Sequence, residues 1–290
     1  MSAIIVQIFL NSIIAGSIYA LLAVGFTFIF GAARFFDLSY GSFAIVGGYA
    51  AFLFFSVLGW PFLVAIPLAI LVTALMGLGV EQLVYRPLKS RKSSNTVMLV
   101  ASLGVLTVTQ ALIAIFFTSQ FHSLTAQSAG QGVFHIFGGA ITETQVAILA
   151  VMILITCALM LVLRYTTFGK AVRAVGDDEE VATIVGIDSR KIVAAVFAIG
   201  YAIAAVGGIG TVFDTGIQPT LSLALLLKAV IAMIIGGIGS IPGAVLGAFL
   251  LGFAENLGAW QFSGEWKDAI AFVVLILFLL FRPQGILGKK

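Results

Sequence analysis

An acidic cluster followed by a short apolar stretch is the segment of this sequence best suited to recognition chemistry. Residues 177–180 are all Asp or Glu, and the sequence VATIVGI follows them directly. Negative charge is favourable in the first turn of a helix and glycine often ends one, so we predict a short helix here that stops at Gly186. Residues spaced by three and four share a helix face, which gives one apolar stripe made of Val181, Ile184 and Val185. From these residues alone, the stripe suits packing on the chain's own helix ends and binding to a partner equally well.

Two ionisable residues, Lys228 and Glu255, lie inside long apolar stretches. A charge at membrane depth is costly and commonly marks a solute path or a buried pair. At 1.5 Å per residue, both are about 8 to 10 Å from the ends of their stretches that face the same side, so they are able to meet. Two interpretations stay open. The residues line or gate the outer half of a solute path and engage a substrate's charged ends, or they form a purely structural pair.

Other chemistry is missing from the sequence. No nucleophile triad and no G-x-x-x-x-G-K-[ST] phosphate loop is present, so we predict no catalytic site and no ATP-binding site in this chain. Cys157 is the single cysteine, which excludes a disulfide framework and cysteine-type metal spacing. We expect no metal and interpret Cys157 as a core residue.

The composition is that of a membrane protein. The chain is 61% hydrophobic and 9% charged, whereas soluble domains average about 45 to 50% and about 25%. Because lipid offers the backbone no hydrogen-bond partners, long apolar stretches cross it as helices. We therefore predict an all-α, polytopic membrane helix bundle, formed by a single transmembrane domain over residues 1–290.

Nine apolar stretches have roughly the length of a membrane span, although eight spans also fit. The second and the seventh stretch are doubtful, because glycines within or beside an apolar stretch are typical of broken or re-entrant helices. The glycines concerned are Gly41, Gly47, Gly48, Gly236, Gly237 and Gly239. The stretches are 4–30, 41–59, 61–82, 96–118, 144–164, 191–212, 221–238, 242–260 and 268–282.

The basic residues orient these stretches. If the chain alternates sides through nine spans, all but two of the 15 Lys and Arg residues fall on one face, which the positive-inside rule assigns to the cytoplasm. We predict an N-terminus outside, a C-terminus in the cytoplasm, and a cytoplasmic loop over residues 165–191. The net charge of +3 then reflects topology and not nucleic-acid binding.

The acidic loop resembles a known docking element. The run from Glu180 to Gly186 resembles the E-A-A-x-x-x-G loop of ABC importer permeases, with valine at the position of the first alanine. In that family the loop's helix enters a groove on the ATPase subunit. The resemblance therefore implies an ATPase-coupling helix built from Asp178, Glu179, Glu180, Val181, Ala182, Ile184, Val185 and Gly186.

Similarity along nearly the whole chain narrows this family. The sequence is similar to the branched-chain amino acid (LivH-type) importer permeases, specifically the shorter of their two paralogous membrane subunits. The stretches that carry the similarity are GSIYALLAVGFTFIFG at 16–31, YRPL at 85–88, FGKAVRAVGDDEEVATIVGI at 168–187, IIGGIGSIPGAVLGAFLLGFAE at 234–255 and FRPQGILG at 281–288. One departure is residues 36–42, FDLSYGS, where many members have an N-F-A-H-G-E-like sequence, so tyrosine and serine replace histidine and glutamate.

The resemblance implies a multi-pass subunit of an ATP-driven importer in a bacterial or archaeal inner membrane. Its partners would be two cytoplasmic ATPase subunits that hold ATP and Mg, a second membrane permease (a paralogue or another copy of this chain) and an extracytoplasmic solute-binding protein. A branched-chain or other amino acid is the expected solute, with urea or a small amide as the alternative. An ion-coupled carrier or channel without an ATPase is the alternative from another class.

Overall fold

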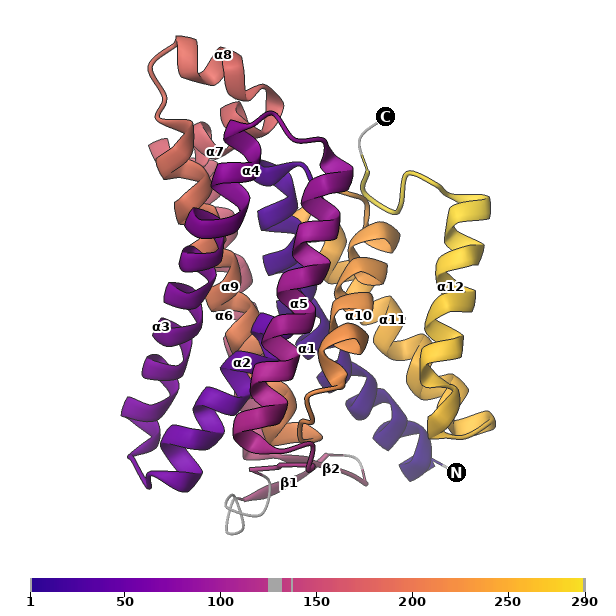
Figure 1. Cartoon of the computed structure of the whole chain (residues 1–290). Helices are drawn as coiled ribbons and strands as arrows, with labels where there is room; N and C mark the ends of the chain where they lie inside the picture. Colours follow the sequence, from indigo (N-terminus) through magenta and orange to yellow (C-terminus); the bar gives the residue numbers. More distant parts are fainter. Residues whose placement is uncertain (1, 125–131, 137, 289–290) are drawn as a thin grey trace.

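The computed structural model describes residues 2–124, 132–136 and 138–288, and it is helical almost throughout (Figure 1). The basic residues Lys289 and Lys290, used above for orientation, lie outside this range. Within the described residues, seven helices are long and apolar enough to cross a membrane. The chain is therefore a polytopic helical bundle, as the composition predicts.

The long helices are α1 (Ser2–Ala33), α3 (Phe62–Val80), α5 (Asn95–Phe117), α6 (Glu143–Tyr165), α9 (Ser189–Asp214) and α11 (Ile241–Gln261). Shorter helices are α2 (Tyr40–Ala51), α4 (Arg86–Ser90), α7 (Thr167–Asp177), α8 (Glu179–Ile184), α10 (Leu221–Gly236) and α12 (Lys267–Phe281). Two π-helical turns, η1 (Phe52–Val57) and η2 (Glu81–Tyr85), extend α2 and α3. Helix α2 together with η1 is the seventh helix long enough to cross a membrane. A 3-10 turn η4 (Gly264–Trp266) precedes α12. An antiparallel hairpin joins β1 (Val133–Ile136) to β2 (Gly139–Thr142).

Each of the nine predicted apolar stretches coincides with one of these helices. The third runs further than predicted, because η2 and α4 continue α3 to Ser90. Helices α10 and α12 have only 16 and 15 residues and are too short to count among the seven.

The prediction for Cys157 is wrong, because its side chain is exposed on the outside of α6. An apolar residue on a membrane helix faces outward as readily as inward, so the hydrophobic run gave no information on its side.

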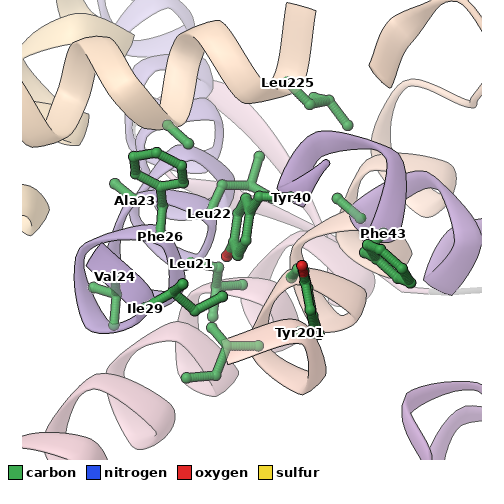
Figure 2. Close-up of a cluster of buried hydrophobic side chains, with 14 of the residues drawn as sticks. Leu21, Leu22, Ala23, Val24, Phe26, Ile29, Tyr40, Phe43, Tyr201 and Leu225 are labelled. Carbon is green, nitrogen blue, oxygen red and sulfur yellow. The ribbon is translucent and has the colours of Figure 1, made fainter. Parts of the chain in front are cut away.

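The core surrounds α1, which packs against α9, α10 and α11. Leu21, Leu22 and Phe26 of α1 are at most 1% exposed, and Tyr40, Phe43 and Tyr201 from α2 and α9 meet them in one cluster (Figure 2). Helices α3, α5 and α6 are buried over only 22% of their apolar windows. They form the outside of the bundle, where exposed apolar side chains suit a lipid environment.

The two ends of the bundle carry different elements. Helices α4, α7 and α8 and the C-terminus lie at one end, and the N-terminus and the β1–β2 hairpin lie at the other (Figure 1). The 165–191 loop therefore shares its end with the basic residues of α4, as the charge pattern predicts.

The chain does break inside the bundle, but in front of the glycines that were expected to mark the break. Helix α1 ends at Ala33, Arg34 adopts a left-handed φ of 58°, and residues 34–39 are non-helical until α2 begins at Tyr40. The Tyr40 hydroxyl fills the space beside Gly25, two turns or about 12 Å before the end of α1, so α2 starts well inside the bundle.

Helix α2 itself runs without interruption through Gly41, Gly47 and Gly48, so the interpretation of these residues as breaks is wrong. They permit close packing: a Cβ on Gly41 would collide with the carbonyl of Ser222 in α10, and one on Gly47 with the backbone of α9. The other three predicted positions, Gly236, Gly237 and Gly239, end α10 and form the turn to α11. A glycine that permits close contact and one that breaks a helix look alike in sequence.

Candidate functional site

Helix α8 forms where the acidic cluster predicted it. The Asp178 carboxylate accepts hydrogen bonds from the backbone amides of Glu180 (2.9 Å) and Val181 (3.0 Å), which caps the helix. At the other end, Gly186 has a φ of +90° and its amide donates to the carbonyl of Thr183. Both ends of this short helix are therefore fixed by the residue types that the sequence pattern singled out.

The apolar stripe of α8 is exposed. Val181, Ile184 and Val185 are 54%, 83% and 69% exposed, whereas Ala182 on the opposite side is 2% exposed. The structure thus does not pack the stripe on the chain's own helix ends, one of the two readings that the sequence left open. An exposed apolar stripe held on a capped helix is the surface that a protein partner can bury.

Polar contacts fix α8 to the bundle beneath it. Glu179 forms an ion pair with Lys89 of α4 at 2.6 Å. The Thr183 hydroxyl lies 3.0 Å from that of Ser189, the first residue of α9. Asp188 caps α9, and its hydrogen bonds with the Lys191 side chain and amide hold the pKa of this exposed carboxyl below its usual value. The helix is therefore tied by polar contacts to α4 and α9.

Lys228 and Glu255 meet, as their positions in the sequence suggested. The Lys228 ammonium lies 3.1 Å from Glu255 Oε2 and 3.0 Å from the Tyr19 hydroxyl, which itself donates to Oε2 at 2.6 Å. The Glu255 side chain is fully buried, and its Oε1 has no hydrogen-bond partner among the described residues. One carboxylate oxygen thus accepts hydrogen bonds from two other helices, α1 and α10, while the other has no partner within the described part of the chain.

A groove of about 420 Å³ opens beside this ion pair. Its lining includes the ends of α6, α9, α10 and α12 that lie on the side of the β1–β2 hairpin, and its size is that of a small-molecule site. Lys228 also approaches Asp268 of α12 at 3.5 Å, and Gln145 donates to Asp214 at 3.0 Å on the far wall. We call this cavity the Lys228 groove; its polar lining residues are Asn11, Tyr19, Gln145, Thr211, Asp214, Thr215, Lys228, Asn256, Lys267 and Asp268.

A third polar site was not predicted. Asp37, in the break before α2, is 1% exposed, and both of its carboxylate oxygens are hydrogen bonded. Tyr85 of η2 donates to Oδ1 at 2.7 Å and Tyr201 of α9 donates to Oδ2 at 2.5 Å. The hydroxyl and amide of Ser39 also donate to Oδ1, at 2.6 and 3.0 Å. We call these four residues the Asp37 cluster.

Sequence reasoning missed Asp37 because it falls between two apolar stretches, where an acidic residue is normally exposed. Its only signal was the departure from the family pattern at residues 36–42. Glu81, which is 3% exposed in η2, was also missed although it lies within a predicted span. Among the residues that the structure describes, no group of three His, Cys, Asp or Glu side chains is placed to hold a metal ion.

Comparison with known proteins gives a consistent result. The family model described as "Branched-chain amino acid transport system / permease component" matches residues 8–279. The chain is 35% identical to the high-affinity branched-chain amino acid transport system permease protein BraD of Pseudomonas aeruginosa, over 98% of this chain and 95% of that protein. It is 34% identical to the permease protein LivH of the corresponding high-affinity system of Escherichia coli, over 96% and 94%.

A solved structure shares the fold. PsaBC from Streptococcus pneumoniae, in complex with a Fab, superposes with a TM-score of 0.54 and covers 96% of this chain and 91% of its own. At 14% identity the likeness extends to the arrangement of helices alone.

Proposed function

Because this chain belongs to the family of branched-chain amino acid transport permease components, we propose that it is a membrane subunit of an ATP-driven importer. The solute would be a branched-chain or other small amino acid, delivered by an extracytoplasmic binding protein. Two separate ATPase subunits would supply the energy, since this chain lacks a phosphate loop. A second permease, either a paralogue or another copy of this chain, would complete the solute path.

The observation that carries this proposal is the exposed apolar stripe of α8. Three apolar side chains project from a helix that is capped at both ends and tied to α4 and α9. Keeping such a stripe exposed to water is unfavourable, so its presentation favours a partner that covers it. The match of its sequence to the permease docking motif supports the ATPase subunit as that partner.

The same proposal sets the orientation. With α8 in the cytoplasm, the C-terminus is cytoplasmic, and the N-terminus and the β1–β2 hairpin face outside. We assign nine spans in a bacterial or archaeal inner membrane, with α10 and α12 as short spans beside the seven long ones. The basic residues of α4 and the 165–191 loop then lie on the inner side, in agreement with the positive-inside rule.

We assign the Lys228 groove to the outer part of the solute path. An amino acid carries an ammonium and a carboxylate, and the groove offers Lys228 for the carboxylate and Asp214 and Asp268 for the ammonium. The partnerless Oε1 of Glu255 supports the same assignment, because a purely structural pair would be expected to use both oxygens. The groove faces the side from which a binding protein would release its solute.

Docking can be tested by purifying the chain with candidate ATPase subunits. Ile184→Asp places a charge in the stripe, and we expect it to weaken ATPase binding at least about tenfold, or about 1.4 kcal/mol, because that charge must be buried on docking. Ile238→Asp is the matched control, since Ile238 is 49% exposed in the turn after α10 and lies off α8. Equal ATPase binding by the wild type and Ile184→Asp contradicts the docking assignment.

The solute can be tested in vesicles that contain the complete importer and its binding protein. We expect ATP-dependent uptake of labelled leucine, competed by isoleucine and valine. Uptake of urea or a small amide without leucine uptake would show that the substrate assignment is wrong while leaving the importer assignment intact. Uptake that persists without any ATPase subunit would contradict the importer itself.

A further inference from the structure

The Asp37 cluster joins the break before α2 to two elements, η2 and α9, that lead to contacts with α8. Tyr85 comes from η2, which continues directly into α4, and α4 holds α8 through the 2.6 Å Lys89–Glu179 ion pair. Tyr201 comes from α9, whose first residue, Ser189, contacts Thr183 of α8. Two separate routes therefore lead from α8 to the same carboxylate.

A third route reaches the break from its other end. The Arg34 guanidinium donates to the carbonyl of Gly176 at 2.5 Å and forms an ion pair with Asp177 at 3.7 Å, both at the C-terminal end of α7. Gly176 also packs so closely on Gly31 of α1 that a Cβ would collide with the Gly31 carbonyl. Residues 34–37 are thus held at Arg34 by α7 and at Asp37 by η2 and α9.

The break is also fixed against α5, and the start of α2 is fixed against α10. The amide of Leu38 donates to the Ser102 hydroxyl of α5 at 3.0 Å. Gly41, at the start of α2, lies against Ser222 and Leu226 in the first turns of α10. A displacement of residues 34–39 therefore shifts the start of α2 relative to α10, the helix that carries Lys228 of the groove.

The chemistry of the cluster suits a mechanical link. A buried carboxylate with hydroxyl donors from two different helices gains strong charge-assisted hydrogen bonds and keeps the donors in fixed positions. All of its described donors are neutral, so no ion-pair partner competes for it. These hydrogen bonds are lost only if η2, α9 and residues 34–39 move apart.

We propose that Asp37 is the positioning residue through which motion of α8 reaches the interior of the membrane. This inference rests on the proposed docking of an ATPase subunit at α8. When the ATPase moves α8, the α4 and α9 connections shift Tyr85 and Tyr201 relative to Arg34. The Asp37 carboxylate converts that shift into movement of the 34–39 break and of the start of α2. Without it, the ATPase would still bind and hydrolyse ATP, but its motion would not open the path.

The test compares single hydroxyl deletions in the complete importer reconstituted in vesicles. Tyr85→Phe and Tyr201→Phe each remove one hydrogen bond to Asp37 and keep the packed ring, and Asp37→Asn removes the charge. Tyr49→Phe is the matched control, because Tyr49 is 1% exposed on α2 and its hydroxyl has no hydrogen-bond partner among the described residues. Three quantities are measured: ATPase subunits bound, ATP hydrolysed, and solute imported per ATP.

We expect the three cluster variants to bind the ATPase like the wild type while importing at least about fivefold less solute per ATP, with Tyr49→Phe unchanged. A loss of folded protein lowers import and hydrolysis together, so it leaves their ratio unchanged and is distinguished from uncoupling. If solute imported per ATP stays within twofold of the wild type in both tyrosine variants, the inference is overturned. If the wild-type chain binds no ATPase, the proposed function fails instead.

Discussion

Two buried carboxylates in this protein are held in different ways. Asp37 receives hydrogen bonds only from neutral hydroxyl and amide groups, and both of its oxygens are used. Glu255 is paired with a cation, Lys228, and one of its oxygens has no partner among the described residues. The first site lies beside packed aromatic rings, with Phe43 and Phe197 against Tyr201, and the second borders an open groove.

The difference shows what each site is suited to do. A carboxylate whose hydrogen bonds are all made can only hold its neighbours in place, so Asp37 suits a mechanical role. Lys228 lines the groove and can exchange its contact with Glu255 for one with a charged solute, so this site suits contact with the solute. Substitutions that remove one partner and leave the other buried should therefore lower the free energy of unfolding by different amounts at the two sites.

The largest expected effect is that of Lys228→Met. It leaves the fully buried Glu255 without its cation, and breaking a buried ion pair costs about 3 to 5 kcal/mol. Thermal unfolding of the detergent-solubilised protein should show this loss, and solute uptake should fall to background.

The double variant Lys228→Met, Glu255→Gln separates stability from transport at this site. Removing both charges should recover most of the lost stability, because no uncompensated charge remains. Uptake should stay at background if the pair contacts the solute. Recovery of uptake together with stability would show that the pair is only structural, and normal uptake by Lys228→Met would contradict both roles.

Asp37→Asn should cost less, about 2 kcal/mol, because it weakens charge-assisted hydrogen bonds without leaving a partner charge behind. The same unfolding measurement checks this value. A loss equal to that of Lys228→Met would break the comparison, since it would indicate a buried cation beside Asp37.

Tyr85→Phe sharpens the comparison within the Asp37 cluster. Its hydroxyl donates to Asp37 at 2.7 Å, so we expect a loss of about 1 to 2 kcal/mol in the free energy of unfolding. Tyr49→Phe removes an equally buried hydroxyl that has no hydrogen-bond partner in the described part of the chain, and it should be neutral or slightly stabilising. Equal losses in the two variants would mean that the hydrogen bond to Asp37 contributes nothing specific.

The smallest effect on stability is expected for Asp268→Asn. Its side chain is 67% exposed and 3.5 Å from Lys228, and exposed ion pairs contribute only about 0 to 1 kcal/mol. The unfolding temperature should hardly change, whereas the concentration of solute needed for half-maximal uptake should rise if Asp268 contacts the ammonium. An unchanged uptake curve would remove Asp268 from the proposed path.

Local sequence patterns predicted the elements that depend on local chemistry. The acidic cap and Gly186 fix the ends of α8, and both interactions span only a few residues. The apolar stretches predicted the long helices because span length follows from membrane thickness. The pairing of Lys228 with Glu255 was predictable for the same reason, since their depths follow from helix rise and the cost of burying a charge restricts the choice of partners.

The sequence by itself therefore determined the class of protein, the positions of its helices, the capped helix α8 and the pairing of Lys228 with Glu255. Only the tertiary structure decided which surfaces of those helices meet. It exposed Cys157, buried Asp37, and used Gly41 and Gly47 for packing where a break was expected. The physical reason is that lipid and core are both apolar, so hydrophobicity does not tell a membrane helix which side faces inward. The side is chosen by close packing and hydrogen bonds between residues far apart in the chain, such as Asp37 and Tyr201.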